Sequence, residues 1–439
     1  MQISLPGVPQ AKQGREVPQK WAWTEAAVWT ERMVATLERG IKGGKWYSLM
    51  DKVWKIENLQ SATQQVLRNK GGAGVDGESC EHYRRQAPER MERLQKELQN
   101  GRYTPPPVKR VWIPKLGSKE LRPLGIPTVE DRIVQTAVRN VIEPIFENIF
   151  AEQSYGFRPG RGAKDALRRV DQLLKAGRNW VVDADLKGYF DTIPQDQLMA
   201  AVSEHISDGA MLELLEKMLR QGVMESGKGW KPTETGTPQG AVVSPLLANI
   251  YLNPLDHKMA QAGKEMVRYA DDFVVLCHTE EEAEEVLREL RKWAEAAGLT
   301  LHPVKTRIVD ANQKGGFEFL GYHFERGKRW PRKKSIEKLR ETIREKTKRL
   351  DPRPISEMVM NVNRTLQGWF TYFKHSTKQV FRVQDQFVRR RLRTVLRRRH
   401  KLQGRGRGRD HQRWPNAYFA ELGLISLALA REEASHSQR

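Results

Sequence analysis

The stretch Met266-Val-Arg-Tyr-Ala-Asp-Asp-Phe-Val-Val-Leu276 places two acidic residues between two apolar runs. Short apolar runs on either side of a turn are typical of a β-hairpin, so we expect Asp271 and Asp272 at its tip. A second apolar run, Trp180-Val-Val-Asp-Ala-Asp185, ends in another carboxylate. If this strand end lies beside the hairpin, three hard oxygen ligands converge, as a pair of divalent ions requires. Two aspartates at a turn are also ordinary turn chemistry, so the pair alone does not decide.

Helical patterns alternate with strands around this region. Apolar residues with a period near 3.6 predict helices from Thr24 to Arg39, Leu59 to Arg68, Thr128 to Phe150 and Thr279 to Gly298. Thr128 and Thr279 are expected to cap the last two, with Asp131 at the capping-box position of the former. Short, partly alternating runs between Val108 and Ile126 predict a basic hairpin. Together these patterns predict an α+β fold.

Positive charge is concentrated near one end of the sequence. The formal net charge is +22, and residues 326–410 hold 28 Lys and Arg against 7 Asp and Glu, which leaves almost no excess elsewhere. The patterns in this part predict basic helices, and such a surface attracts a polyanion. We therefore expect a nucleic-acid surface there, with an anionic membrane as the minor alternative.

Several segments carry simpler expectations. Cys80 and Cys277 are far apart in sequence, which excludes a zinc site of paired CxxC type and a disulfide framework. An apolar leader and an 18-residue apolar run are both missing from the sequence, so we expect a cytoplasmic protein without a membrane partner.

We expect residues 430–439 to be disordered. The tryptophans Trp21, Trp23 and Trp29 either pack internally or dock RNA, and packing is favoured.

Seven sequence blocks follow one another in a characteristic order. Together they resemble group II intron-encoded reverse transcriptases, the maturase family, over residues 46–424. The blocks are Arg122-Pro-Leu-Gly-Ile-Pro127, Ser154-Tyr-Gly-Phe-Arg-Pro-Gly-Arg161, Asp185-Leu-Lys-Gly-Tyr-Phe-Asp191, Gly236-Thr-Pro-Gln-Gly240 with Ser244-Pro-Leu-Leu-Ala-Asn249, Tyr269-Ala-Asp-Asp272, Leu301-His-Pro-Val-Lys-Thr306 and Phe319-Leu-Gly-Tyr322. The ending is similar to that of bacterial class C members, which implies that no endonuclease domain follows.

The resemblance implies a right-hand polymerase fold, with fingers and palm followed by an all-α basic thumb and maturase domain. The boundaries we expect are an N-terminal extension over 1–45, fingers over 46–175, palm over 176–325, thumb and maturase domain over 326–424, and a tail over 425–439.

The same resemblance implies an RNA-directed DNA polymerase that uses two Mg²⁺ ions, with Mn²⁺ as a substitute. The implied partners are group II intron RNA, an RNA template–DNA primer duplex, target DNA and deoxynucleoside triphosphates. Splicing and retrohoming of the parent intron are the implied roles, in a bacterial cytoplasm near the nucleoid. Two alternatives stay open: a host-adapted relative in DNA repair or defence, and a non-catalytic RNA-binding splicing cofactor.

Roles around the metal site also follow from the resemblance. Asp185, Asp271 and Asp272 would bind the metals, assisted by the Leu186 carbonyl. Phe190 would exclude a ribose 2′-hydroxyl, or else be a core aromatic residue, and Gln239 would contact the incoming nucleotide, or else form a plain turn. Lys115, Arg122 and Arg158 would bind the triphosphate of the nucleotide, or else merely solvate a loop, and Lys305, also in the nucleotide site, would protonate the leaving pyrophosphate.

Two further sets of residues are expected to hold nucleic acid. The block Phe319, Leu320, Gly321 and Tyr322 resembles the family's primer grip. Four arginines of the basic C-terminal part are expected to contact phosphates: Arg389, Arg390, Arg393 and Arg397. The interleaved Trp369, Tyr372 and Phe373 either stack on bases or, as we favour, fill the helical core.

Overall fold

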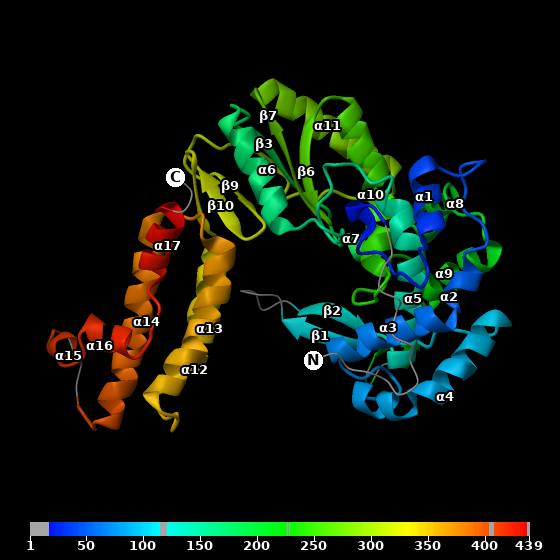
Figure 1. Ribbon diagram of the computed structural model, residues 1–439. Coiled ribbons are helices and arrows are strands. Elements are labelled where there is room, and N and C mark those ends of the chain that lie inside the picture. Colours follow the sequence, from blue (N-terminus) through cyan, green and yellow to red (C-terminus); the bar gives the residue numbers. More distant parts are fainter. Residues whose placement is uncertain (1–16, 115–120, 226, 228, 404–407, 437–439) are drawn as a thin grey trace.

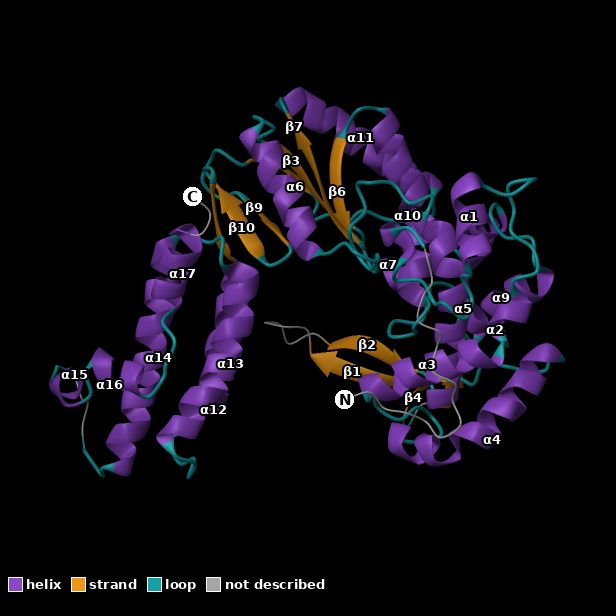
Figure 2. Ribbon diagram, viewed as in Figure 1, coloured by secondary structure: helices purple, strands orange, loops and turns teal. Residues whose placement is uncertain are grey.

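The computed structural model describes residues 17–114, 121–225, 227, 229–403 and 408–436. It is an α+β fold, as expected, and its strands form three separate sheets (Figure 2). In Figure 1 the sheet that contains β3, β6 and β7 lies at the top. The helices α12, α13, α14 and α17 descend on one side of it, and β1, β2 and the helices α3 to α5 lie on the other.

The N-terminal half is mainly helical and shares one large core with the central sheet. Its helices are α1 (Glu31–Arg39), α2 (Met50–Val53), α3 (Ile56–Asn69), α4 (Cys80–Gln99) and α5 (Val129–Glu147), preceded by a 3-10 turn at Gln19–Trp21. The first helix is shorter than expected, because the Thr30 hydroxyl caps it and the chain before Thr30 is not helical. Trp21 and Trp29 are fully buried, so packing is confirmed for both, and Trp23 is about one third exposed.

The basic hairpin forms as predicted, from β1 (Val108–Pro114) and β2 (Leu121–Ile126). Two short strands extend its sheet: β4 (Val223–Glu225), which runs parallel to β1, and β5 (Gly229–Lys231). These two strands come from the range that we expected to belong to the palm. The expected boundary at residue 176 therefore cuts across a sheet of the structure.

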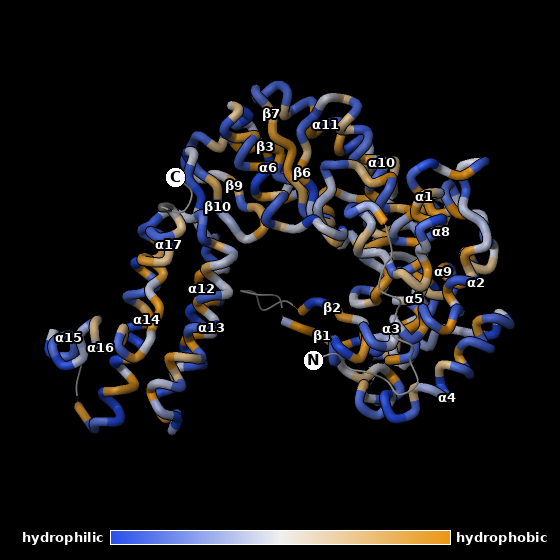
Figure 3. Tube along the Cα trace, viewed as in Figure 1, coloured by the Kyte–Doolittle hydropathy of each residue, from blue (hydrophilic) through white to orange (hydrophobic). Residues whose placement is uncertain are grey.

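The central sheet has the order β6-β7-β3-β8. Its strands are β3 (Trp180–Asp185), β6 (Glu265–Tyr269), β7 (Asp272–Cys277) and β8 (Arg307–Asp310). The apolar colour of β3, β6 and β7 in Figure 3 reflects burial on both faces. One face joins the large core, through residues such as Val182 and Phe273, and the other joins a second core, through Val181 and Val274.

Six further helices of the described residues lie in this part of the chain. They are α6 (Ala163–Lys175), α7 (Tyr189–Thr192), α8 (Gln195–Ser203), α9 (Gly209–Arg220), α10 (Ser244–Gln261) and α11 (Glu280–Ala296). Of these, α6, α10 and α11 pack against the strands of the sheet. Thr279 caps α11, as predicted. The helix α6 packs in the second core against the central sheet, although its residues fall in the range that we expected to be fingers.

The C-terminal part begins with a three-stranded sheet and continues as helices. Its strands are β9 (Phe317–Phe319), β10 (Tyr322–Glu325) and β11 (Lys328–Pro331), and its helices are α12 (Lys333–Lys346), α13 (Ile355–Phe373), α14 (Lys378–Arg399), α15 (Arg409–Arg413), α16 (Asn416–Glu421) and α17 (Leu427–His436). These helices enclose a third core. Phe373 is buried in the second core, and Trp369 packs against the second and third cores, which confirms packing for both.

The end of the described chain is helical, so the expected disorder over 430–439 is wrong for residues 430–436. The Asp385 carboxylate on α14 accepts hydrogen bonds from the Leu427 and Ala428 amides and from the Ser426 hydroxyl. A carboxylate at a helix N-terminus satisfies amides that have no partner within the helix. This cap, together with the fully buried Leu427, fixes α17 against α14.

Candidate active site

Asp185 and Asp272 face each other at the end of the central sheet. They are the last register pair of the antiparallel strands β3 and β7. Directly opposed residues of an antiparallel pair point to the same face, with their Cβ atoms roughly 4.5–5.5 Å apart. In the neighbouring hairpin Tyr269 pairs with Asp272, so Ala270 and Asp271 form the two-residue turn. Strand pairing thus brings the three predicted carboxylates together.

The raised pKa values of these aspartates show that their negative charges repel one another. Burial, and after it the neighbouring carboxylates of Asp183, Asp271 and Asp185, together raise the pKa of Asp272 to about 7. Burial also raises the pKa of Asp271, and Asp185 adds to this increase. Closely spaced carboxylates repel one another and favour a bound cation or proton. The oxygen ligands and the negative charge of these aspartates therefore suit a divalent cation. In the described part of the chain, however, no three Asp, Glu, His or Cys side chains are already placed to hold a metal ion together.

Asp183 is a fourth carboxylate, which the sequence analysis did not select. It lies two residues before Asp185 on β3, so both side chains point to the same face of the sheet. Burial raises its pKa to about 6, and Arg307 opposes that increase through an ion pair of 3.5 Å. The Asp-Ala-Asp spacing within a strand was the signal that could have revealed it.

Lys305 forms an ion pair with the carboxylate of Asp185. Its Nζ atom donates to Asp185 Oδ2 at 2.6 Å, and its side chain is 60 % exposed. The backbone nearby is tied down as well, because the His302 amide donates to the Asp185 carbonyl at 2.7 Å. Leu186 is buried and forms a β-bridge with Leu301. Lys305 can therefore balance the charge of Asp185 before a cation binds.

The loop that carries Gln239 approaches the same region. Gln239 Nε2 donates to Asp191 Oδ2 at 2.8 Å, and its carbonyl accepts from the Gly125 amide of β2. Gly240 has a φ of +108°, and a Cβ atom there would lie 2.3 Å from the Gly125 carbonyl oxygen. Only glycine therefore fits this close approach of two backbones. The Thr237 amide donates to the Phe190 carbonyl at 2.7 Å, so the loop and α7 are joined.

Two family models match the chain in succession. Residues 113–324 match "Reverse transcriptase (RNA-dependent DNA polymerase)" and residues 336–414 match "Group II intron, maturase-specific domain". The chain is 36 % identical to Protein YkfC of Escherichia coli over an alignment of 315 residues, and the match covers 62 % of this chain and 82 % of that protein.

The chain belongs to the group II intron-encoded reverse transcriptases. It is also 39 % identical over 202 residues to the group II intron-encoded protein LtrA of Lactococcus lactis, a match that covers 46 % of this chain and 33 % of LtrA. Among solved structures, a telomerase from Candida albicans is similar with a TM-score of 0.42 and 14 % identity, over 76 % of this chain and 67 % of that one. Members of this family generally use divalent metal ions.

Three cations were expected to contact triphosphate in this reverse transcriptase. Arg122 is exposed on β2, and Lys115 lies outside the described residues. Arg158 requires a correction: its side chain is 3 % exposed, and it donates to the Glu147 carboxylate and to the Ala151 and Ser154 carbonyls. A guanidinium held by these partners faces the protein, so Arg158 anchors its loop and is not placed to bind phosphate.

The residues expected to grip the primer form a tight hairpin turn between β9 and β10. Phe319 pairs with Tyr322, and both side chains are buried. Leu320 and Gly321 form the turn with positive φ angles of +47° and +84°. The Leu320 carbonyl accepts from the Tyr372 hydroxyl at 2.8 Å. Phe319 and Tyr322 therefore support the turn from the core, and of the four residues only Leu320 and Gly321 are partly exposed.

The four arginines of α14 differ in their surroundings. Arg390 is exposed, and Arg389 is half-buried. Arg393 is buried and donates to the Trp414 carbonyl and Asn416 Oδ1, both at 2.9 Å. Arg397 pairs with Asp410 at 2.8 Å. The expectation for Arg393 and Arg397 is therefore corrected, because both attach α14 to the segment around α15 and α16.

Proposed function

We propose that this chain extends a DNA primer on an RNA template, with two Mg²⁺ ions bound by Asp185, Asp271 and Asp272. The opposition of Asp185 and Asp272 across β3 and β7, beside the Asp271 turn, is the observation that carries the proposal. Such ions lower the pKa of the attacking primer hydroxyl and neutralise charge on the triphosphate, and Mn²⁺ can replace Mg²⁺. The Leu186 carbonyl, next to Asp185 in sequence, would assist.

The side chains around the carboxylates position the nucleotide in this proposal. Gln239, held by Asp191, contacts the incoming nucleotide, and Phe190 excludes a ribose 2′-hydroxyl. Lys305 balances the charge of Asp185 in the free protein and turns to the phosphates when a cation occupies the carboxylates. Arg122 adds a cation from the exposed edge of β2. Positive charge placed where negative charge grows is a large source of rate enhancement.

The helical part supplies the nucleic-acid surface. Almost all of the net charge lies in residues 326–410, and α12 and α14 carry much of it. Charged faces of this kind hold phosphates without reading the sequence. The proposed partners are the template–primer duplex, target DNA and the intron RNA, whose splicing and retrohoming the protein would assist. The match to a maturase-specific domain supports this role.

A primer-extension assay tests the polymerase proposal. We expect the purified protein to extend a DNA primer on an RNA template with deoxynucleotides and Mg²⁺, and Asp271→Asn to be inactive. Asp196→Asn is the matched control, because the Asp196 side chain is 97 % exposed and lies outside the site. Wild-type protein that binds the duplex without extending the primer would overturn the proposal and favour a non-catalytic splicing cofactor.

The role in splicing needs a separate measurement. We expect the protein to bind the group II intron RNA encoded beside its gene and to lower the Mg²⁺ concentration at which that RNA splices. The Asp271→Asn variant should retain this effect, because the substitution changes one carboxylate and none of the basic residues. Figure 1 shows the helices that carry them, α12 and α14. An active polymerase whose flanking DNA contains no intron would instead indicate a host-adapted enzyme.

A further inference from the structure

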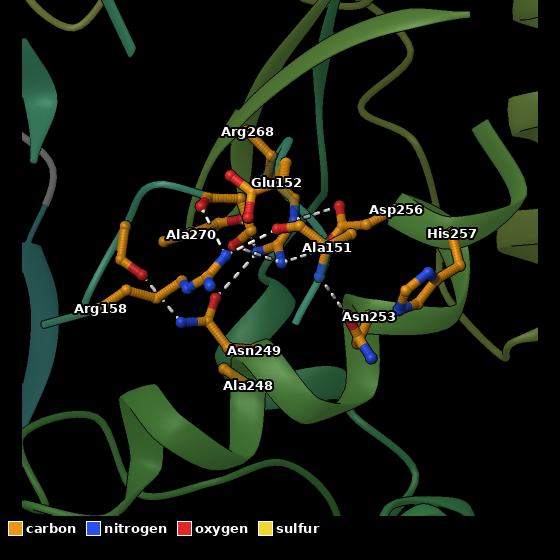
Figure 4. A network of polar contacts seen from close by, with 12 residues as sticks. Ala151, Glu152, Arg158, Ala248, Asn249, Asn253, Asp256, His257, Arg268 and Ala270 are labelled. Atoms are coloured by element: carbon orange, nitrogen blue, oxygen red, sulfur yellow. Dashed lines mark hydrogen bonds and ion pairs between the residues drawn. The ribbon is translucent and has the colours of Figure 1, made fainter. Parts of the chain in front are cut away.

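Arg268 is a fully buried arginine on β6, three residues before Asp271. Its Nε atom donates to Asp256 Oδ1 at 2.7 Å, and Nη2 pairs with the second oxygen of the same carboxylate (Figure 4). Asp256 lies on α10 and is fully buried as well. Burial raises the pKa of Asp256, and the Arg268 charge opposes that increase.

The remaining donors of Arg268 reach three different segments. Nη1 donates to the Ala270 carbonyl and to Asn249 Oδ1, both at 2.9 Å, and Nη2 donates to the Ser154 hydroxyl at 2.8 Å. Figure 4 shows Arg268 between Asn249 and Ala270. One guanidinium thus joins the carboxylate turn to α10 and to the loop before α6.

The Ala270 contact is the most informative of these. Ala270 has a φ of +59°, which is unfavourable for a residue with a Cβ atom by about 1 kcal/mol. It directly precedes Asp271, so its peptide orientation sets where the carboxylate of this turn residue points and how the chain enters β7 at Asp272. A hydrogen bond to its carbonyl from a rigid, fully buried guanidinium holds this conformation.

The loop from Ser154 to Gly156 holds the turn from the other side. The Tyr155 amide donates to the Arg268 carbonyl at 2.8 Å, and Asn249 Nδ2 donates to the Gly156 carbonyl at 2.8 Å. A Cβ atom on Gly156 would lie 2.5 Å from the Ala270 nitrogen. The loop backbone therefore touches the turn, and Asn249 connects that loop to Arg268.

Stability alone does not account for this arrangement. A buried ion pair is often no more stabilising than apolar residues of similar volume, because both charges lose their hydration. Arg268 instead offers what an apolar side chain cannot, which is several directed hydrogen bonds on one planar group. Four of its five contacts end on the turn, on its supporting loop or on the α10 carboxylate that fixes the guanidinium.

We propose that Arg268 is a positioning residue of the polymerase site, which fixes the Ala270 peptide and thereby the placement of Asp271 and Asp272. The proposal rests on the function proposed above for these carboxylates. Loss of this hydrogen bond would let the turn relax and separate the carboxylates, so metal binding and chemistry would weaken while binding of the primer–template stays the same.

The test compares Arg268→Lys with wild-type protein in single-turnover nucleotide incorporation across a Mg²⁺ titration. Lysine keeps the charge beside Asp256 but lacks the planar fork that also reaches Ala270 and Asn249. We expect the rate per active site to fall about 10- to 100-fold and the Mg²⁺ needed for half the maximal rate to rise. Duplex affinity should stay unchanged. Arg169→Lys is the control, because Arg169 pairs with Glu265 on the same strand but lies away from the turn.

The outcomes separate this proposal from the one on which it rests. If the wild-type protein incorporates no nucleotide, the proposed polymerase function itself is wrong. If the wild-type enzyme is active and a folded Arg268→Lys variant has the same rate per active site and the same Mg²⁺ dependence, the positioning role is wrong. If Arg268→Lys does not fold, Asn249→Ala tests the same network, because it removes the second acceptor of Nη1, the nitrogen that holds Ala270, and the hydrogen bond to the Gly156 carbonyl, so the turn should loosen. An unchanged Mg²⁺ dependence in that variant would likewise overturn the proposal.

Discussion

Asp185 and Asp272 occupy the final register pair of β3 and β7, so two acidic side chains stand directly across from each other on one face of the sheet. Like charges directly opposed on neighbouring strands are destabilising. The sequence keeps this arrangement and adds Asp183 on the same face and Asp271 at the adjoining turn. A cation bound among these carboxylates would offset their repulsion, which gives a reason for this arrangement.

The first prediction concerns the stability of the metal-free protein. Replacement of Asp272 by Asn removes one charge from the repelling group, so the melting temperature in EDTA at pH 8 should rise by about 2 °C. Added Mg²⁺ should raise the melting temperature of wild-type protein more than that of the variant. Thermal unfolding with and without Mg²⁺ measures both effects, and a variant less stable than wild type in EDTA would contradict the repulsion.

Nucleotide selection by Phe190 can be tested directly. The ring is half-buried and lies edge-on to Tyr189, with 5.6 Å between the ring centroids. Phe190→Ala should reduce the preference for deoxynucleotides over ribonucleotides by about tenfold or more, because the bulk opposing the 2′-hydroxyl is gone. Incorporation of each nucleotide by the two proteins gives the ratio. An unchanged ratio would show that Phe190 is a packing residue.

Two arginines of α14 should behave in opposite ways. Arg390 is exposed, so Arg390→Gln should weaken binding to a template–primer duplex and reduce the slope of log affinity against log salt by about 0.9. Arg393 is buried against Trp414, so Arg393→Gln should lower the free energy of unfolding by about 2 kcal/mol. Salt-dependent binding and thermal melts check the pair. A reversed pattern would refute the assignment of these side chains.

A buried carboxylate on α5 predicts how stability depends on pH. Burial raises the pKa of Asp131 from 3.8 to about 7, although Tyr103 and Gln135 donate to it at 3.0 and 2.9 Å. An acid with a raised folded pKa contributes stability that is complete below pH 3.8 and is lost as the pH rises through 7. Wild-type protein should therefore lose about 2.7 kcal/mol relative to Asp131→Asn between pH 5 and pH 8, since each pH unit between 5 and 7 removes about 1.4 kcal/mol.

The Asp131→Asn variant is a suitable reference because asparagine can keep the hydrogen bonds to Tyr103 and Gln135. Its amide oxygen can accept from Gln135, and its amide nitrogen can donate to the Tyr103 hydroxyl oxygen. Gln135 must keep its orientation, since its own oxygen accepts from the Val242 amide at 2.7 Å. Melting temperatures of both proteins at several pH values give the difference. A difference that stays constant with pH would show that Asp131 does not titrate in this range.

The elements that the sequence predicts well are those with strong local patterns. Thr128 and Thr279 accept from the amides three residues on, as expected for helix caps, and the hairpin around Asp271 forms as its two apolar runs indicate. Asp131 shows the limit of such patterns. The capping-box position predicts a carboxylate that turns back to the helix start, whereas the structure directs it inward to Tyr103 and Gln135.

The side-chain roles were harder to predict, because they depend on contacts between distant residues. Arg158 and Arg393 belong to basic stretches that are typical of phosphate contacts, yet tertiary partners bury both. Arg268 was hidden for the same reason, since its partners Ser154, Asn249 and Asp256 come from separate segments. Helix α17 was missed because its cap, Asp385, lies on another helix.

The central claim is that Asp185, Asp271 and Asp272 together hold the metal ions of an RNA-directed DNA polymerase. Single-turnover incorporation of one deoxynucleotide on an RNA template, by wild-type protein and by each Asp→Asn variant, tests it most directly. The account predicts a rate at least about 10³-fold lower for each variant, with duplex affinity and folding retained. A folded Asp185→Asn or Asp271→Asn variant that incorporates at a rate close to wild type would contradict it.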